Sequence, residues 1–172
     1  DRILSHIAQA ITAKASAYWM DGFSLHPFMA TLDTILASQP LIGIQIAAID
    51  RQNSLLKLEE AANRRNLPIW CWSALSPGFH HLGEALEEWQ AVVNLGDEIL
   101  QVLQPQALGV GVYVYLDLFT AIDALAPIDR VRAHQAITNL FFALQHSPDT
   151  RIAFLETGEI PSKFVQLIHN YN

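Results

Sequence analysis

Four polar side chains stand where runs of apolar residues end, and they are the first candidates for chemistry: Asp50, Ser73, Asp117 and Glu156. Each follows a segment whose apolar run is typical of a buried β-strand. Parallel strands place their carboxyl ends at one edge of a sheet, and open α/β sheets bind ligands at that edge. We therefore expect the four side chains at the strand ends, as candidates for binding a ligand or cofactor.

The segment after the first of these strands argues against the binding of a nucleoside phosphate. A phosphate loop needs glycines, whose backbone N–H groups wrap the phosphate, and a lysine at the start of the next helix. Residues 47–54 (AAIDRQNS) contain neither glycine nor lysine. Asp50 also places a negative charge where the phosphate would bind, and two anions repel one another. The sequence predicts that Asp50 instead caps the helix that follows.

Asp117 and Glu156 end the third and fourth apolar strands. Residues 113–119 (YVYLDLF) have the pattern of a strand whose Asp holds Mg²⁺, but Leu118 stands where ATP-hydrolysing proteins place a Glu to polarise water. A simpler alternative is that Asp117 caps the next loop or helix. Glu156 and Thr157 are either a pair that senses a ligand or a solvated strand end.

The other reactive groups lack suitable partners. His80 and His81 are adjacent, and only Glu84 is near them at ligand spacing. Cys71 lies inside a strand, where a small inert core thiol is expected. No serine has the glycine-flanked pattern of a hydrolase nucleophile. The sequence predicts no catalytic residue, no metal ligand and no cofactor.

Helical and strand patterns alternate along the chain. Apolar residues at three- and four-residue spacing predict helices over residues 2–19, 28–38, 51–65, 84–104, 128–145 and 161–169. Continuous apolar runs predict strands over residues 41–49, 67–73, 109–119 and 151–157, and residues 76–81 are expected to form a turn. Strands separated by helices pair in parallel. The predicted fold class is therefore α/β, a three-layer sandwich with a mostly parallel sheet and two N-terminal helices.

Composition limits the class of protein. The chain of 172 residues fits one domain, and its 51% hydrophobic and 16% charged residues exclude disorder. The net charge of -7 disfavours nucleic acid as a partner, and no apolar run is long enough for a membrane span. The single cysteine, Cys71, excludes an internal disulfide and indicates a reducing compartment. The surplus of apolar residues indicates protein partners, and both termini look like cuts made inside a longer chain.

The order and spacing of several segments resemble a known family. The segments are residues 28–36 (FMATLDTIL), 39–42 (QPLI), 58–62 (LEEAA), 67–73 (LPIWCWS), 113–119 and 150–161. They resemble the N-terminal part of an AAA-type ATPase-like family that is encoded in algal plastid genomes, as a hypothetical chloroplast reading frame, and in cyanobacteria. The resemblance runs from about residue 28 to residue 169.

The resemblance implies a fold and a function. In that family the N-terminal module is similar to a RecA-like, P-loop-NTPase-like fold that lacks the phosphate loop, while a C-terminal module carries the ATPase. Residues 39–172 would form the degenerate RecA-like domain, and residues 1–38 a helical segment packing on it. The implied role is non-catalytic, in regulation or assembly, through contacts with the C-terminal ATPase module or other subunits. It implies a cytoplasmic or plastid-stroma protein, and leaves a homo-oligomer open.

Two other functions are compatible with the residues. One is a small-ligand-binding or enzymatic α/β domain that uses Asp50, Ser73, Asp117 and Glu156, and it requires these side chains to converge on a pocket. The other is a phospho-acceptor domain with Asp117 as the acceptor. The paired acidic residues that would hold its metal are not evident after the first strand.

Overall fold

The computed structural model describes residues 31–82 and 92–171. The chain divides into two compact units, residues 1–35 and residues 36–172. Of the first unit only residues 31–35 are described, and helix α2 (Leu32–Ser38) begins there, inside the helix predicted over residues 28–38. The helix predicted over residues 2–19 lies outside the described residues, as does most of the N-terminal segment 1–38.

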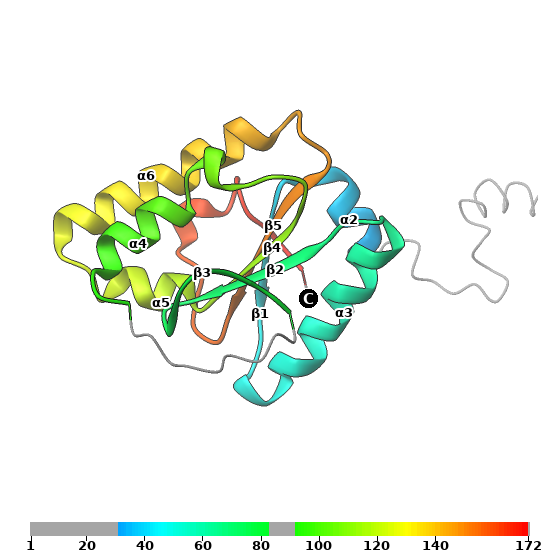
Figure 1. Ribbon diagram of the computed structural model, residues 1–172, viewed down its shortest axis with the longest axis horizontal. Helices are drawn as coiled ribbons and strands as arrows, with labels where there is room; N and C mark the ends of the chain where they lie inside the picture. Colours follow the sequence, from blue (N-terminus) through cyan, green and yellow to red (C-terminus); the bar gives the residue numbers. More distant parts are fainter. Residues whose placement is uncertain (1–30, 83–91, 172) are drawn as a thin grey trace, which may run out of the picture. The chain divides into compact units, whose positions relative to one another are not determined.

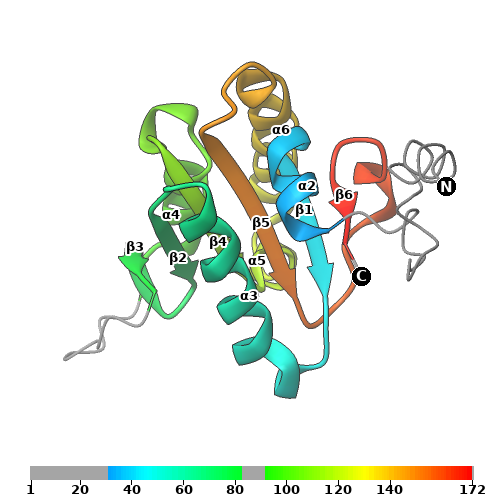
Figure 2. The same ribbon diagram turned by 90° about the vertical axis from the view of Figure 1, so that its right-hand side faces the viewer.

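The second unit is built on a six-stranded sheet with the order β3-β2-β4-β5-β1-β6 (Figures 1 and 2). Its strands are β1 (Leu41–Gln45), β2 (Ile69–Ser73), β3 (Ser76–His81), β4 (Gly111–Leu116), β5 (Thr150–Glu156) and β6 (His169–Asn170). All neighbouring strands are parallel except β2 and β3. The predicted α/β class with a mostly parallel sheet is confirmed.

Helices cover both faces of this sheet. Helix α3 (Arg51–Arg64) lies on one face, and α4 (Leu95–Val102), α5 (Leu118–Asp123) and α6 (Pro127–Leu144) lie together on the other (Figure 1). Strand β5 is buried along its whole length, and β1 and β4 along most of theirs. Strands covered on both faces have no solvent side, which is why their sequences are nearly continuous apolar runs.

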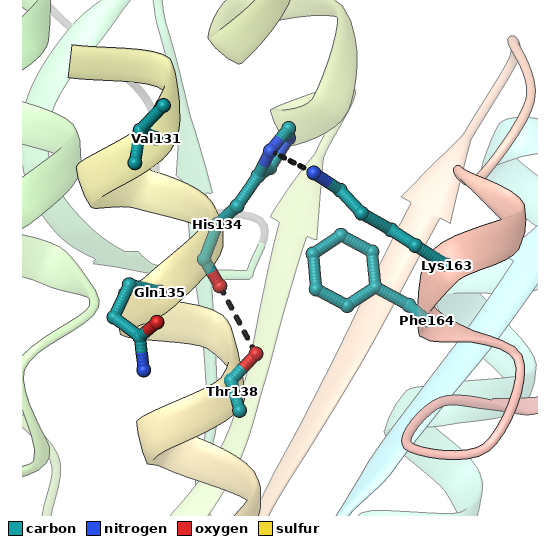
Figure 3. Close-up of a pocket in the computed structure, with 6 residues that line it drawn as sticks. All are labelled: Val131, His134, Gln135, Thr138, Lys163 and Phe164. Atoms are coloured by element: carbon teal, nitrogen blue, oxygen red, sulfur yellow. Dashed lines mark hydrogen bonds between the residues drawn. The ribbon is translucent and has the colours of Figure 1, made fainter. Parts of the chain in front are cut away.

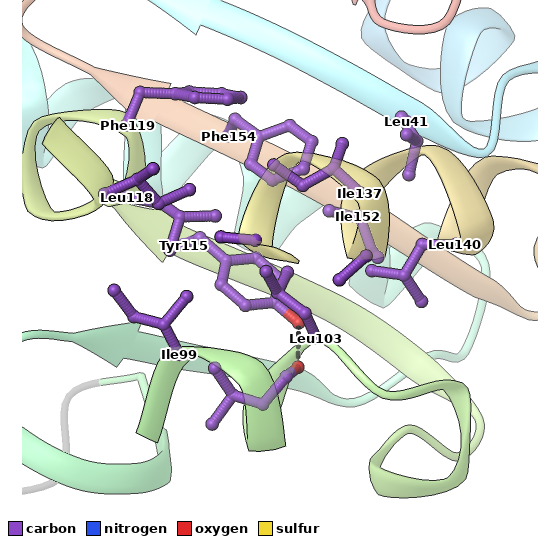
Figure 4. Packing of buried hydrophobic residues seen from close by; sticks show 14 of the residues in the cluster. Leu41, Ile99, Leu103, Tyr115, Leu118, Phe119, Ile137, Leu140, Ile152 and Phe154 are labelled. Carbon is purple, nitrogen blue, oxygen red and sulfur yellow. Dashed lines mark hydrogen bonds between the residues drawn. The ribbon is translucent and has the colours of Figure 1, made fainter. Parts of the chain in front are cut away.

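The core beneath α4, α5 and α6 is aromatic at its centre. Tyr115 of β4 and Phe154 of β5 lie side by side with ring centroids 5.7 Å apart. Aliphatic side chains from the three helices and their ends pack around them, among them Ile99, Leu103, Leu118, Ile137 and Leu140 (Figure 4). The Tyr115 hydroxyl, fully buried, donates a hydrogen bond of 2.6 Å to the carbonyl of Val102. This bond fixes the end of α4 on the sheet.

Two segments of the hairpin region differ from the sequence prediction. Residues 76–81 form the antiparallel edge strand β3 rather than a turn. Phe79 explains the difference, because its ring packs edge-on against Tyr113 and Tyr115, while an edge strand tolerates the neighbouring proline and glycine. The helix predicted over residues 84–104 is helical only over Leu95–Val102 among its described residues, and Val93, just before it, is fully exposed. Asn94 starts the helix, since its side chain accepts a 3.1 Å hydrogen bond from the N–H of Asp97.

The helix predicted over residues 161–169 is wrong. The segment contains only the 3-10 turn η4 (Ser162–Phe164) and then β6, which pairs with β1. Gly43 explains this course, since a Cβ there would lie 2.5 Å from Ile160 Cδ1 and 2.9 Å from Ile168 Cγ2. The absence of a side chain on β1 lets the segment pack against the sheet instead of continuing as a helix.

Two predicted strands are also shorter than expected. The strand predicted over residues 41–49 ends at Gln45 and is followed by the 3-10 turn η2 (Ala48–Asp50). The strand predicted over residues 109–119 ends at Leu116, and its last residues begin helix α5. Both corrections concern the strand ends, where the candidate side chains lie.

Candidate functional site

The chain reverses direction across the sheet between β1 and β5. From β1 it passes to β2, on one side, whereas from β5 it passes to β6, on the other. Adjacent parallel strands whose connections leave in opposite directions define the switch point at which open α/β sheets bind ligands. The candidate site is therefore the carboxyl edge formed by the ends of β1, β5 and the neighbouring β4.

Asp117 lies at the centre of this edge, directly after β4. Its backbone has a left-handed conformation with φ 51° and ψ 40°, which Asp tolerates better than most residues. One carboxylate oxygen, Oδ1, accepts hydrogen bonds from the N–H of Thr157 at 2.8 Å and from its hydroxyl at 3.0 Å. The other, Oδ2, forms a close ion pair with the guanidinium of Arg51. Both oxygens of Asp117 are thus occupied by the protein itself.

Arg51 reaches Asp117 from the first residue of α3. The Arg51 and Asp117 side chains are 35% and 29% exposed, so the pair is only partly shielded from water. Arg51 Nε is buried and has no hydrogen-bond partner within the described residues. Arg51 has no role in the predictions from sequence, although it is a cation directly after Asp50, where a phosphate loop would end in lysine.

Glu156 lies beneath this pair and is fully buried. Its Oε2 accepts a 3.1 Å hydrogen bond from the N–H of Phe119, whereas Oε1 is buried without a partner among the described residues. Burial raises the pKa of the Glu156 carboxyl to about 7, and the charge of Asp117 raises it further, while the first N–H groups of α5 lower it. The side chain therefore exchanges a proton near neutral pH.

The four predicted strand-end candidates are only partly brought together. Asp117 and Glu156 lie close enough for the charge of one to act on the pKa of the other. Asp50 is exposed, and although it occupies the N-cap position directly before α3, its side chain makes no capping hydrogen bond, so the predicted cap is wrong. Ser73 accepts a 3.3 Å hydrogen bond from the N–H of Leu75 in the β2–β3 hairpin. Neither Asp50 nor Ser73 is hydrogen-bonded to the two carboxylates.

The histidine pair and the cysteine are engaged in packing. His80 Nε2 lies 3.1 Å from both Ser76 Oγ and the Pro77 carbonyl oxygen, and His81 stacks on Trp70 with ring centroids 4.0 Å apart. Burial raises the pKa of the Cys71 thiol to about 11, so it stays protonated at pH 7. Within residues 31–82 and 92–171, no group of three His, Cys, Asp or Glu side chains could hold a metal ion.

A second polar group lies on α6, away from the strand ends. Lys163 of η4 approaches His134 of α6, with its ammonium 2.6 Å from Nδ1 (Figure 3). The two side chains line a surface hollow of about 290 Å³ together with Val131, Gln135, Thr138 and Phe164. A second hollow of about 520 Å³ lies between α4 and α6.

Comparison of the chain with family models, curated proteins and solved structures yields no match. The family resemblance of its sequence therefore stays a prediction. Among the helices that the structure describes, none is both long and apolar enough to cross a membrane. The function has to be inferred from the side chains of the site, because a fold alone does not determine one.

Proposed function

We propose that this chain is a non-catalytic module of an AAA-type ATPase-like protein, with a role in regulation or assembly that it performs through contacts with protein. It combines the α/β scaffold of a degenerate RecA-like domain with a strand-end site closed by the protein's own side chains. The observation that carries the proposal is the ion pair between Arg51 and Asp117.

The pair supports this proposal through its charge. A strand-end Asp that serves a nucleotide holds Mg²⁺ through a free carboxylate. Here the guanidinium of Arg51 neutralises Asp117, and Thr157 occupies the second oxygen. A Mg²⁺ ion would have to displace Arg51 from Asp117. The guanidinium would then lose its carboxylate partner, although its buried Nε already has no hydrogen-bond partner among the described residues. Asp117 is therefore a poor metal ligand.

The connection from β1 to α3 supports the proposal independently. A phosphate cradle is made by successive N–H groups that converge because the backbone alternates between right- and left-handed conformations. Residues 46–50 contain no glycine, and none of them has a positive φ. They form the short turn η2, in which Ile49 is 89% exposed. This turn offers a phosphate no ring of donors.

A contact role agrees with the surface. Large apolar side chains are exposed on several elements of the described chain, including Ile49, Leu56, Leu75, Val110, Ile128, Val131, Phe142 and Val165. Single exposed apolar residues are ordinary, but their concentration on one element indicates a contact surface. Three of these residues belong to α6: Ile128, Val131 and Phe142.

One observation favours the alternative of a ligand-binding or enzymatic site. Glu156 has a pKa of about 7 and an unpartnered oxygen, which are properties of a proton-transfer group. Its side chain is fully buried, however, so no ligand contacts it unless the residues that cover it move. We therefore rank this function second.

The proposal also names a cellular compartment and a partner. The module would act in the cytoplasm or plastid stroma, a reducing environment with which its single, unpaired cysteine agrees. Its first partner would be an ATPase module encoded downstream in the same reading frame.

The reading frame provides the first test. If the coding sequence continues beyond Asn172 into a domain with a glycine-rich phosphate loop, that domain can be purified and its ATPase rate measured with and without this module. We expect the module to change the rate, and its Asp117→Asn variant to change it equally, because Asp117 takes no part in the chemistry. A reading frame without such a domain, or an effect that Asp117→Asn abolishes, would contradict the proposal.

A further inference from the structure

Helix α6 has an outward face with the spacing of a helix-packing seam. Ile128, Val131, Gln135, Thr138 and Phe142 follow one another at intervals of three and four residues. Such spacing places side chains in one stripe along a helix. Ile128, Val131 and Phe142 are 57%, 63% and 62% exposed, although the opposite stripe of α6 is buried against the sheet. The helix therefore has a second apolar stripe that the described chain leaves uncovered.

Surface hollows flank this stripe on both sides, and Gln135 lines both of them. The hollow of about 290 Å³ lies toward η4, where the Phe164 ring and the Lys163 side chain form its wall (Figure 3). The hollow of about 520 Å³ lies toward α4 and is lined by Leu100, Leu103 and Arg132, among others. A ridge between two hollows is the shape into which the side chains of a second helix pack.

The charges along the stripe are mostly positive. The segments α6 and η4 carry three cations, Arg130, Arg132 and Lys163, and one carboxylate, Asp129, in a chain whose net charge is -7. The Asp129 carboxylate lies against the backbone of Gly96 and 3.5 Å from Arg132. No carboxylate lines either hollow.

Lys163 contacts a neutral side chain rather than a carboxylate. An ammonium only donates, so His134 Nδ1 must accept its hydrogen bond and the imidazole must be neutral. Burial and the charge of Lys163 both lower the pKa of His134, which keeps the imidazole neutral at pH 7. Lys163 therefore has an uncharged acceptor where an ammonium usually meets a carboxylate, and its ammonium also lies 5.7 Å from the centre of the Phe164 ring.

We propose that the α6 surface, consisting of the outward stripe of α6 and the two hollows beside it, docks an acidic amphipathic helix of a partner protein. The apolar side chains of that helix would pack on Val131 and Phe142, and its carboxylates would meet Lys163 and Arg132. The inference rests on the proposed contact function and deepens it by naming the surface and the chemistry of the partner.

Charge complementarity selects this occupant over two others. A second copy of the chain that paired through the same surface would bring Arg130, Arg132 and Lys163 against their own equivalents, and like charges at an interface are unfavourable. A nucleic acid would need many cations to neutralise its phosphates, whereas this surface has three. An acidic helix satisfies both the apolar stripe and the cations.

The test uses defined peptides of about 18 residues, which form about five helical turns. One has leucines at three- and four-residue spacing and glutamates on both flanks; the second has lysine at each glutamate position. Each is titrated into the ¹⁵N-labelled chain at low salt and followed by NMR. We expect the glutamate peptide to shift the amide signals of α6 and η4 saturably, and to bind about ten-fold or more tightly than the lysine peptide.

Charge reversal provides the matched variants. Arg132→Glu combined with Lys163→Glu should weaken the glutamate peptide about ten-fold and strengthen the lysine peptide. Lys57→Glu, a single charge reversal at an exposed position of α3 and half the charge change of the double variant, should change neither affinity. Both peptides binding equally, shifts confined to other elements, or insensitivity to the double charge reversal would overturn the docking surface. So would concentration-dependent shifts of α6 without peptide, because a second copy would then cover it.

The two proposals fail in different ways. Binding of Mg²⁺ and ATP at the strand ends would overturn the non-catalytic function and leave the peptide result unaffected. Failure of the peptide to bind would overturn the docking surface alone.

Discussion

Arg51 and Asp117, 66 positions apart in the sequence, form an ion pair across the carboxyl edge of the sheet. Arg51 begins α3 after β1, Asp117 joins β4 to α5, and Thr157, bound to the same carboxylate, follows β5. Three strand-end connections thus meet at one carboxylate. The pair holds together the edge at which an α/β domain would otherwise bind its ligand.

The first prediction concerns the contribution of this pair to stability. Arg51→Met and Asp117→Asn should each lower the free energy of unfolding by about 1 kcal/mol, because a partly exposed pair is screened by water. Asn keeps an acceptor for Thr157 and tolerates the left-handed backbone, so it removes mainly the charge. Urea denaturation of the single variants and the double variant would measure the coupling. If the two losses simply add, Arg51 and Asp117 do not stabilise one another.

The second prediction concerns pH. The pKa of Glu156 is about 7 in the folded protein, against 4.5 for a free carboxyl, so the folded state holds this proton more tightly than the unfolded state. The associated stability is complete below pH 4.5 and is lost as the pH rises through 7, on the order of 3 kcal/mol in all. Urea denaturation at a series of pH values between 5 and 8 should show this loss.

Glu156→Gln isolates that contribution. The amide keeps an oxygen for the N–H of Phe119 but carries no titrating proton, so the stability difference from the wild type should change with pH over this window. The variant should gain relative to the wild type as the pH rises. A difference that stays constant from pH 5 to pH 8 would show that Glu156 titrates normally.

The third prediction concerns Gly43 and the last segment of the chain. Gly43→Ala places a Cβ against the side chains of Ile160 and Ile168, which must shift, so we expect a loss of about 1–3 kcal/mol. Gly158→Ala is the matched control, because its Cβ would meet only Thr120 Oγ1, at 3.7 Å. Thermal unfolding would compare the two variants, and equal melting temperatures would count against the close packing at Gly43.

The fourth prediction concerns the buried Tyr115 hydroxyl. Tyr115→Phe leaves the Val102 carbonyl without its 2.6 Å donor in the core, which should cost about 1–2 kcal/mol. Hydrogen exchange should become faster in α4, since this bond attaches the end of that helix. Unchanged exchange in α4 together with unchanged stability would mean that water or another donor replaces the hydroxyl.

The sequence predicts the central part of this fold well for a physical reason. Strands β1, β4 and β5 are buried on both faces, and helices α3 and α6 have buried apolar residues at three- and four-residue spacing, so local pattern alone identifies them. Strand β6 depends instead on a distant residue, Gly43, and β3 depends on Phe79 packing against β4. Such elements are determined by tertiary contacts, which local periodicity does not contain.

The candidate site divides in the same way. That Asp117 and Glu156 lie near one another follows from both ending neighbouring parallel strands, which a sequence pattern can indicate. The role of Arg51 depends on the strand order of the sheet, in which only β5 separates β1 from β4. A local sequence pattern does not contain that order. Asp50 has a capping residue type in the capping position, yet its side chain makes no cap.

The most direct test of a closed strand-end site is isothermal titration of the chain with ATP in the presence of Mg²⁺. Because Arg51 occupies Asp117 and residues 46–50 form no phosphate cradle, we expect no binding tighter than millimolar. Binding in the micromolar range that Asp117→Ala abolishes would contradict the account, because it would show that the Asp117 carboxylate is free to serve a nucleotide.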